Sequence, residues 1–236
     1  SIINVESTFV GDLIVLIYLL IMPALGVVLG AFSSRNPLAS IGGSREIKLM
    51  IAYELPLVLV VLVPVIQAES IRLGVLLTHT PAASVSGVLA LLCGIACMQA
   101  KLTIVPFDMP EAETELSGGV FIEYSGAPLG VYKLTRAMLL FTMPVFLAAL
   151  FFGGVITAPG VAGKFWGLLI WFVLVALTVV IRNTTPRVRT DQAVKFFRGP
   201  VSLVALLAVV LAYLGYCFRS GPNPPLGKNC EENPGD

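Results

Sequence analysis

The stretch VSLVALLAVVLAYL, residues 201–214, is the clearest sign of the fold because it holds no charged residue. The stretch LVLVVLVPV, residues 57–65, is equally apolar. A transmembrane β-strand would alternate polar and apolar residues, and neither stretch does so. A helix satisfies all its backbone hydrogen bonds internally, as lipid requires. These stretches therefore predict helices that cross a membrane.

Similar apolar runs recur along the chain, and each approaches the roughly 20 residues that span a bilayer. We predict an all-α polytopic membrane bundle of about six helices, at residues 9–32, 46–67, 83–105, 127–152, 163–182 and 200–218. Charged residues make up 12% of the chain, against about 25% in soluble domains. Residues 1–218 then form the transmembrane domain, and 219–236 form a polar tail of the composition typical of disorder. No basic patch with interleaved aromatic residues indicates nucleic acid.

Lysine and arginine residues gather on one side of the predicted bundle. The connections after the first, third and fifth helices carry most of them: Arg35, Arg45, Lys48, Lys101, Arg182, Arg187, Arg189, Lys195 and Arg198. The opposite side carries Arg72, Lys164, Arg219 and Lys228. The positive-inside rule therefore places the first side in the cytoplasm and both termini outside.

The segment PFDMPEAETEL, residues 106–116, concentrates carboxylates between two apolar runs, and Glu123 follows it. If Pro110 begins a helical turn, Glu111 and Glu115 share one face, while Glu113 points elsewhere. Carboxylates crowded in a poorly solvated place raise one another's pKa, so they can hold and release protons near neutral pH. The alternative is an acidic loop that caps the following helix.

Glu54 is a second candidate because it lies about two turns inside a predicted membrane helix. An ionisable residue at that depth is a functional hypothesis by default, although a hydrogen-bonded structural glutamate is the alternative. Glu46 lies nearer the helix start, where a capping role competes. Lys133 and Arg136 open the fourth helix, where they either pair with the acidic segment or extend toward the interface.

A catalytic or cofactor site within the chain has no support in its motifs. Cys93 and Cys97 share a helix face, but two thiols without a nearby histidine or second cysteine pair make a poor metal site. No phosphate-binding loop, dinucleotide fingerprint or nucleophile elbow is present in the sequence. We therefore expect no catalytic residue, metal or cofactor in this chain.

Three separated segments resemble one family of membrane subunits. It comprises NADH dehydrogenase subunit 1, also called the H subunit of NADH-quinone oxidoreductase (respiratory complex I), and the corresponding subunits of related membrane-bound hydrogenases. The first is GGSR at 42–45 with Tyr53 and Glu54, and the second is 106–116 with EYSG at 123–126. The third is PRVR at 186–189 with Asp191 and Gln192. Their order and spacing fit the family pattern from about residue 9 to 214.

The resemblance implies a subunit that joins a peripheral, electron-transferring arm to an ion-pumping membrane arm. It implies a polar route into the membrane lined by the carboxylates that match the family, which are Glu54, Glu111, Glu113, Glu115, Glu46 and Glu123. It implies docking of the peripheral arm on Asp108, Tyr124, Arg187, Arg189 and Asp191. The implied partners are iron–sulfur and hydrogenase-like subunits, which hold the Fe–S clusters and NiFe centre, antiporter-like membrane subunits, and membrane lipid.

The family's chains have about eight spanning helices, so we expect this sequence, which opens at Ser1, to lack two N-terminal helices. The loop between those helices forms much of the quinone chamber in complex I. The stretches KLTRAM, 133–138, and TDQAVKF, 190–196, look more like group 4 [NiFe] hydrogenases and formate hydrogenlyases of prokaryotic plasma membranes. The alternatives are a quinone-site subunit of NADH-quinone oxidoreductase, a stand-alone cation transporter and a passive scaffold.

Overall fold

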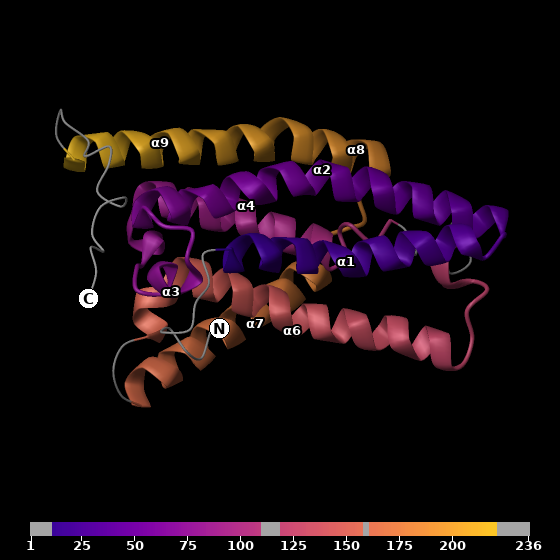
Figure 1. The fold of residues 1–236 in the computed structure, drawn as a ribbon. Coiled ribbons are helices and arrows are strands. Elements are labelled where there is room, and N and C mark those ends of the chain that lie inside the picture. The colour runs from indigo at the N-terminus through magenta and orange to yellow at the C-terminus, as the bar shows by residue number, and fades with distance from the viewer. Residues whose placement is uncertain (1–10, 110–118, 158–160, 221–236) are drawn as a thin grey trace, which may run out of the picture.

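The computed structural model describes residues 11–109, 119–157 and 161–220. The predictions for Glu111, Glu113, Glu115 and the tail from residue 221 lie outside these ranges. Within the described ranges the chain is helical and contains no strand, as predicted. The long helices run alongside one another in an elongated bundle (Figure 1): α1 (Asp12–Ser33), α2 (Pro37–Ala68), α4 (Val85–Lys101), α6 (Ala127–Ile156), α7 (Val161–Thr184) and α9 (Ser202–Ser220).

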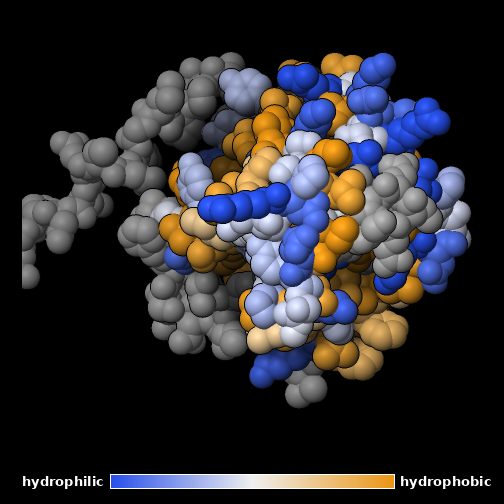
Figure 2. Space-filling model, turned by 90° about the vertical axis from the view of Figure 1, so that its right-hand side faces the viewer, coloured by the Kyte–Doolittle hydropathy of each residue, from blue (hydrophilic) through white to orange (hydrophobic). Residues whose placement is uncertain are grey.

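Short helical elements join the long helices at both ends of the bundle. At one end, α3 (Leu73–Leu76) and η2 (Pro81–Ala83) lead from α2 into α4. At the other end lie η3 (Gly119–Phe121), α8 (Thr190–Phe196) and the π-helical turn η4 (Phe197–Val201). We call this second end the acidic end, because it includes the described residue Asp108 and the start of α6 (Figure 1). Figure 2 views the molecule from this end, where hydrophilic side chains gather among apolar ones.

Five helical stretches are individually long and apolar enough to cross a membrane. The sixth predicted span, 83–105, differs from the prediction. Helix α4 has 17 residues and ends at Lys101, and it qualifies only together with Leu73–Ala83, from which it is bent by 104°. The bent pair is therefore a broken span or a re-entrant segment. After α4 the backbone turns through Thr103, whose φ is positive, and through a cis Val105–Pro106 bond.

Helix α2 begins at Pro37, nine residues before the predicted start. Asn36 caps it by accepting a hydrogen bond from the Leu38 amide at 2.9 Å, and Pro37 provides the fixed φ that suits a first helical turn. Arg45, predicted in a connection, is therefore helical. The 32 residues of α2 extend about 48 Å, so this helix is longer than the roughly 30 Å hydrocarbon core.

The last predicted span also begins early, because α8, η4 and α9 form one 29-residue stretch from Thr190 to Phe218. Pro200 lacks a backbone N–H and lies in the π-helical turn, which accommodates the missing donor without ending the helix. Asp191 and Gln192, predicted in a docking loop, therefore lie in the first turn of a helix.

Helix α2 is the centre of the bundle, because it packs against α1, α4 and α9. Its buried face carries Leu49, Tyr53, Leu57 and Val60. Large apolar side chains cover the outer surface of the bundle. On α7, for example, Leu168, Phe172 and Val180 are exposed. An apolar surface of this kind is compatible with lipid, so we treat the chain as a multi-pass membrane protein.

Candidate functional site

An ion pair that is buried at its lysine joins the middle of α2 to the end of α4. Lys101 Nζ lies 3.5 Å from Glu54 Oε2, and the Lys101 side chain is 1% exposed while that of Glu54 is 24% exposed. The α4 helix ends at Lys101, which places the ammonium group beside the C-terminal carbonyls, where a positive charge is favourable. An unpaired ammonium in this position would be strongly unfavourable, so Glu54 is the group that allows Lys101 to be buried.

Tyr53 forms the wall beside this pair. Lys101 Nζ lies 5.4 Å from the centre of the Tyr53 ring, a cation–π contact. The Tyr53 hydroxyl and the Glu54 Oε1 atom are buried and form no hydrogen bond within the described parts of the chain. Buried polar atoms are nearly always hydrogen-bonded, so each exception calls for an explanation, such as a functional role or a bound water or ion. The pair therefore lies in a polar site whose hydrogen-bonding capacity is only partly used.

Glu46 lies two turns nearer the start of α2 and is 2% exposed. It lines a cavity of about 30 Å³, together with Lys101, Thr103, Tyr132 and Arg136. This volume accommodates a water molecule, and the lining supplies several polar partners for one. The structure thus brings Glu46 and Lys101 to the lining of one small cavity.

Glu123 lies at the acidic end, where its side chain is exposed. Its Oε1 accepts a hydrogen bond of 2.6 Å from Asn36 Nδ2, and Asn36 is the residue that caps α2. Glu123 thus supports the start of α2, a structural role that the sequence analysis did not assign.

The carboxylates along α2 are widely spaced. The rise per residue places Glu46 about 15 Å along the helix from Asn36, the partner of Glu123, and Glu54 about 12 Å from Glu46. These carboxylates are too far apart for direct proton transfer, which requires hydrogen-bond distances or bridging groups.

The two segments predicted to dock a peripheral arm contact each other. Arg187 Nη2 lies 2.6 Å from Asp108 Oδ2 and also donates to the Asp108 carbonyl at 3.3 Å. The Val188 amide donates to the Pro106 carbonyl at 3.1 Å. The side chains of Arg187 and Asp108 are 37% and 20% exposed, so the pair lies at the surface of the acidic end.

The other predicted docking residues divide into two groups. Arg189 and Asp191 are exposed at the start of α8, where the negative charge of Asp191 stabilises the N-terminus of the helix. Tyr124 is half-buried, and its hydroxyl donates to the Gly30 carbonyl at 2.8 Å, which ties the segment before α6 to α1. Arg189 and Asp191 are therefore accessible to a partner, whereas the Tyr124 hydroxyl serves an internal contact.

Two polar residues of α4 were not predicted as part of a site. Lys101 was interpreted only as an orientation signal, but it is buried and paired with Glu54. Gln99 is also buried and donates to the Thr178 carbonyl at 3.1 Å, which joins α4 to α7. The available signal was that both lie at the end of an apolar run, within one turn of each other. In the described residues, no group of three or more His, Cys, Asp or Glu side chains is arranged to hold a metal ion.

The fold and these buried charges define a polytopic helical membrane protein with ionisable groups in its interior. The chain belongs to the NADH dehydrogenase family, whose sequence profile matches residues 2–213. It is 34% identical over 205 residues to the H subunit of NADH-quinone oxidoreductase from Brevibacillus brevis, covering 84% of this chain and 60% of that protein. It is 36% identical over 202 residues to the corresponding protein of Geobacillus kaustophilus, covering 81% and 61%.

A solved structure shares the fold. A chain of the membrane-bound sulfane sulfur reductase, an archaeal respiratory membrane complex, superposes with a TM-score of 0.78 at 27% identity. The match covers 86% of this chain and 69% of that one. The chain spans about 60% of the length of the curated relatives. The resemblance inferred from three short segments is thus confirmed at the level of the family.

Proposed function

We propose that this chain is the ion-translocating membrane subunit of a complex I-related respiratory complex. In this role it couples electron transfer in a peripheral arm to proton or Na⁺ movement in the membrane. The observation that carries the proposal is the buried Glu54–Lys101 pair, with a Glu54 oxygen and the Tyr53 hydroxyl left without hydrogen bonds among the described residues. Ionisable groups buried among membrane helices are costly to maintain and typically serve ion or proton movement.

The mechanism that this geometry supports is a change in which cation compensates the Glu54 carboxylate. Lys101 Nζ lies 3.5 Å from Glu54 Oε2, so each charge offsets the other. Moving the ammonium group away would leave the carboxylate without its partner, and a translocated cation would take that place. A redox-driven shift of the segment after α4, which follows Lys101 directly, would thus move a proton or cation. Glu46 lies in the half of α2 nearer the acidic end, whereas Tyr53 and Glu54 lie at the middle of the helix.

The chain's own residues supply no redox centre in this proposal. Electrons travel through iron–sulfur clusters held by partner subunits, with a NiFe centre in a hydrogenase-type complex. The peripheral arm docks at the acidic end on Asp108, Arg187, Arg189 and Asp191, of which Asp108 and Arg187 are already paired. Glu111, Glu113 and Glu115, which lie outside the described residues, are assigned to the same route by their positions in the sequence. Antiporter-like membrane subunits receive the coupled movement.

The hydrogenase or formate hydrogenlyase branch is the form of the complex that we favour, in a prokaryotic plasma membrane. Support comes from the stretches 133–138 and 190–196 of the sequence. The curated relatives are subunits of NADH-quinone oxidoreductases and the solved neighbour is a sulfane sulfur reductase. A quinone-site subunit of NADH-quinone oxidoreductase is the alternative, and the curated relatives favour it.

The decisive experiment is a coupling measurement on the complex in proteoliposomes. In Glu54→Gln we expect assembly and electron transfer to persist, while ion uptake per electron pair falls at least severalfold. Glu69→Gln is the matched control, because Glu69 is an exposed glutamate at the other end of the same helix. Equal ion uptake in wild type and Glu54→Gln would exclude the role proposed for Glu54. Ion uptake by the purified single chain would instead indicate a stand-alone transporter.

A further inference from the structure

Helix α8 continues into α9 through the π-helical turn η4 (Figure 1). A π-helical turn holds one residue more than an α-helical turn and often marks a functional site. In η4 the Ser202 amide donates to the Phe197 carbonyl, five residues earlier, and the Ser202 hydroxyl donates to the Gly199 carbonyl at 3.1 Å. Pro200 lacks the N–H that a regular α-helix would use at its position. The hydrogen-bond ladder of the α-helix is therefore interrupted, so α8 can bend there relative to α9.

Gly199 lies inside this turn and has room around it. No atom lies within 4 Å of a Cβ built at Gly199, so side-chain packing does not fix its conformation. Glycine has the greatest backbone freedom of all residues and is a poor helix former. Gly199 and Pro200 together therefore make η4 a hinge between α8 and α9.

Both ends of α8 contact the segment that follows α4. Just before the helix begins, the Val188 amide donates to the Pro106 carbonyl at 3.1 Å. Directly after it ends, the ring of Phe197 packs on that of Phe107, with the ring centres 4.9 Å apart. Phe107 is 7% exposed and Phe197 is fully buried, so this contact belongs to the core. Because α8 is attached to the segment at two points, a movement of the helix displaces the segment with it.

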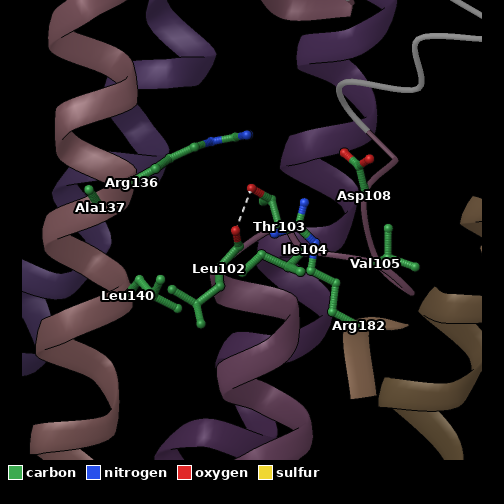
Figure 3. Close-up of a pocket in the computed structure, with 9 residues that line it drawn as sticks. All are labelled: Leu102, Thr103, Ile104, Val105, Asp108, Arg136, Ala137, Leu140 and Arg182. Carbon is green, nitrogen blue, oxygen red and sulfur yellow. Dashed lines mark hydrogen bonds between the residues drawn. The ribbon is translucent and has the colours of Figure 1, made fainter. Parts of the chain in front are cut away.

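The segment 102–109 carries such a displacement to Lys101, the residue directly before it. Figure 3 shows the first part of this segment, where the Thr103 hydroxyl donates to the Leu102 carbonyl at 2.8 Å. Thr103 has a φ of 48°, in the left-handed region that a β-branched residue seldom adopts, so the backbone beside Lys101 is strained. Thr103 is thus a second hinge, two residues from the buried ammonium group.

We infer that Phe107 is a positioning residue that transmits a movement of α8 about the η4 turn to Lys101. Helix α8 and the segment 102–109 form one unit between two hinges, at Gly199 and at Thr103. A partner bound at the exposed start of α8 supplies the movement. The inference rests on the proposed function, because Lys101 acts there through its ion pair. It adds the residues that carry the movement to that pair.

Hydrogen exchange of the intact complex, measured by mass spectrometry before and after reduction with dithionite, tests the link. In wild type we expect reduction to change the exchange rates of the amides in both 196–204 and 103–109, because the two segments move together. In Phe107→Ala the response of 196–204 should persist, while that of 103–109 falls severalfold. Phe107→Leu keeps an apolar contact and should recover part of that response. Phe141→Ala is the matched control, because it removes a different aromatic contact, with the Trp171 ring 5.2 Å away.

Gly199→Ala tests the hinge. An added Cβ touches nothing and alanine favours a regular helix, so packing is unchanged while bending becomes harder. We expect the exchange responses of both segments and the ion uptake per electron pair to fall severalfold, with the peripheral arm still bound. Gly215→Ala is its matched control, because a Cβ at Gly215 in α9 also meets no atom within 4 Å.

Three results would overturn the inference. Unchanged exchange of 103–109 on reduction of wild type would do so without any variant, so the test stands even if a variant fails to assemble. A response of this segment in Phe107→Ala equal to that of wild type would show that the ring transmits nothing. Equal behaviour of Gly199→Ala and Gly215→Ala would show that η4 is not a hinge. Failure of the proposed function is a different outcome: Glu54→Gln then retains full ion uptake, whereas the exchange responses still report the link.

Discussion

Lys101 Nζ lies 3.5 Å from Glu54 Oε2, and this contact joins the last residue of α4 to the middle of α2. It is the point at which two membrane helices share buried charge. Removing one partner of such a pair leaves the other buried without compensation, whereas replacing both by apolar groups is often tolerated. The pair therefore makes different predictions for the single and the double variant.

We expect Lys101→Met to lower the free energy of unfolding by roughly 3 kcal/mol, at the lower end for a buried pair because Glu54 is partly exposed. The double variant Lys101→Met/Glu54→Leu should recover most of this loss but not ion coupling. Lys133→Met, at an exposed position of α6, is the control, and its stability should change by less than about 0.5 kcal/mol. Denaturant unfolding of the chain in detergent measures all three. Equal stability of the two single variants would contradict the prediction.

Tyr53→Phe separates an ion-path role from a packing role. The hydroxyl is buried without a hydrogen bond among the described residues, and its removal leaves the ring contact with Lys101 in place. We expect stability to stay within about 1 kcal/mol of wild type or to rise, because no partner is left unsatisfied. Ion uptake per electron pair should fall if the hydroxyl carries protons. A large loss of stability would show that the hydroxyl has a structural partner.

The Asp108–Arg187 pair should matter more for assembly than for folding. Partly exposed ion pairs contribute about 0–1 kcal/mol, so Asp108→Asn should unfold almost like wild type. We expect it to co-purify with less of the peripheral arm, because the ion pair between the two docking segments is lost. The exchange Asp108→Arg/Arg187→Asp tests pairing itself and should recover part of the yield. Wild-type yield from Asp108→Asn would refute docking through this pair.

Gly30 and Gly26 on α1 provide a matched comparison of close packing. A Cβ at Gly30 would lie 2.2 Å from the Tyr132 hydroxyl oxygen, whereas nothing lies within 4 Å of a Cβ at Gly26. We expect Gly30→Ala to lose about 1–3 kcal/mol through overpacking and displacement of Tyr124. Gly26→Ala should gain about 0.5–1 kcal/mol, because alanine favours helix. Thermal unfolding checks both, and a partial rescue by Tyr132→Phe would identify the clash. Equal changes in stability for Gly30→Ala and Gly26→Ala would argue against the clash at Gly30.

Hydropathy predicted most of the helices correctly because each apolar run is long enough to span a bilayer by itself. It misplaced the helix starts where polar residues extend a helix beyond the membrane. Pro37 and Asn36 start α2 early by local capping, and the π-helical turn carries α8 into α9 past Pro200. It also overestimated the length of α4, which is bent by 104° from the segment that precedes it. These features depend on capping and backbone geometry, which a window of average hydropathy does not detect.

The sequence alone determined the class of protein and the family, because these follow from residue type and order along one chain. Only the tertiary structure decided which charges meet. In the sequence Lys101 served only as an orientation signal, yet the packing of α4 on α2 buries it beside Glu54. Asp108 and Arg187 are separated by 79 positions in the sequence and meet only in the folded chain. Pairing is a property of distance and burial across helices, so it appears only when the helices are placed in space.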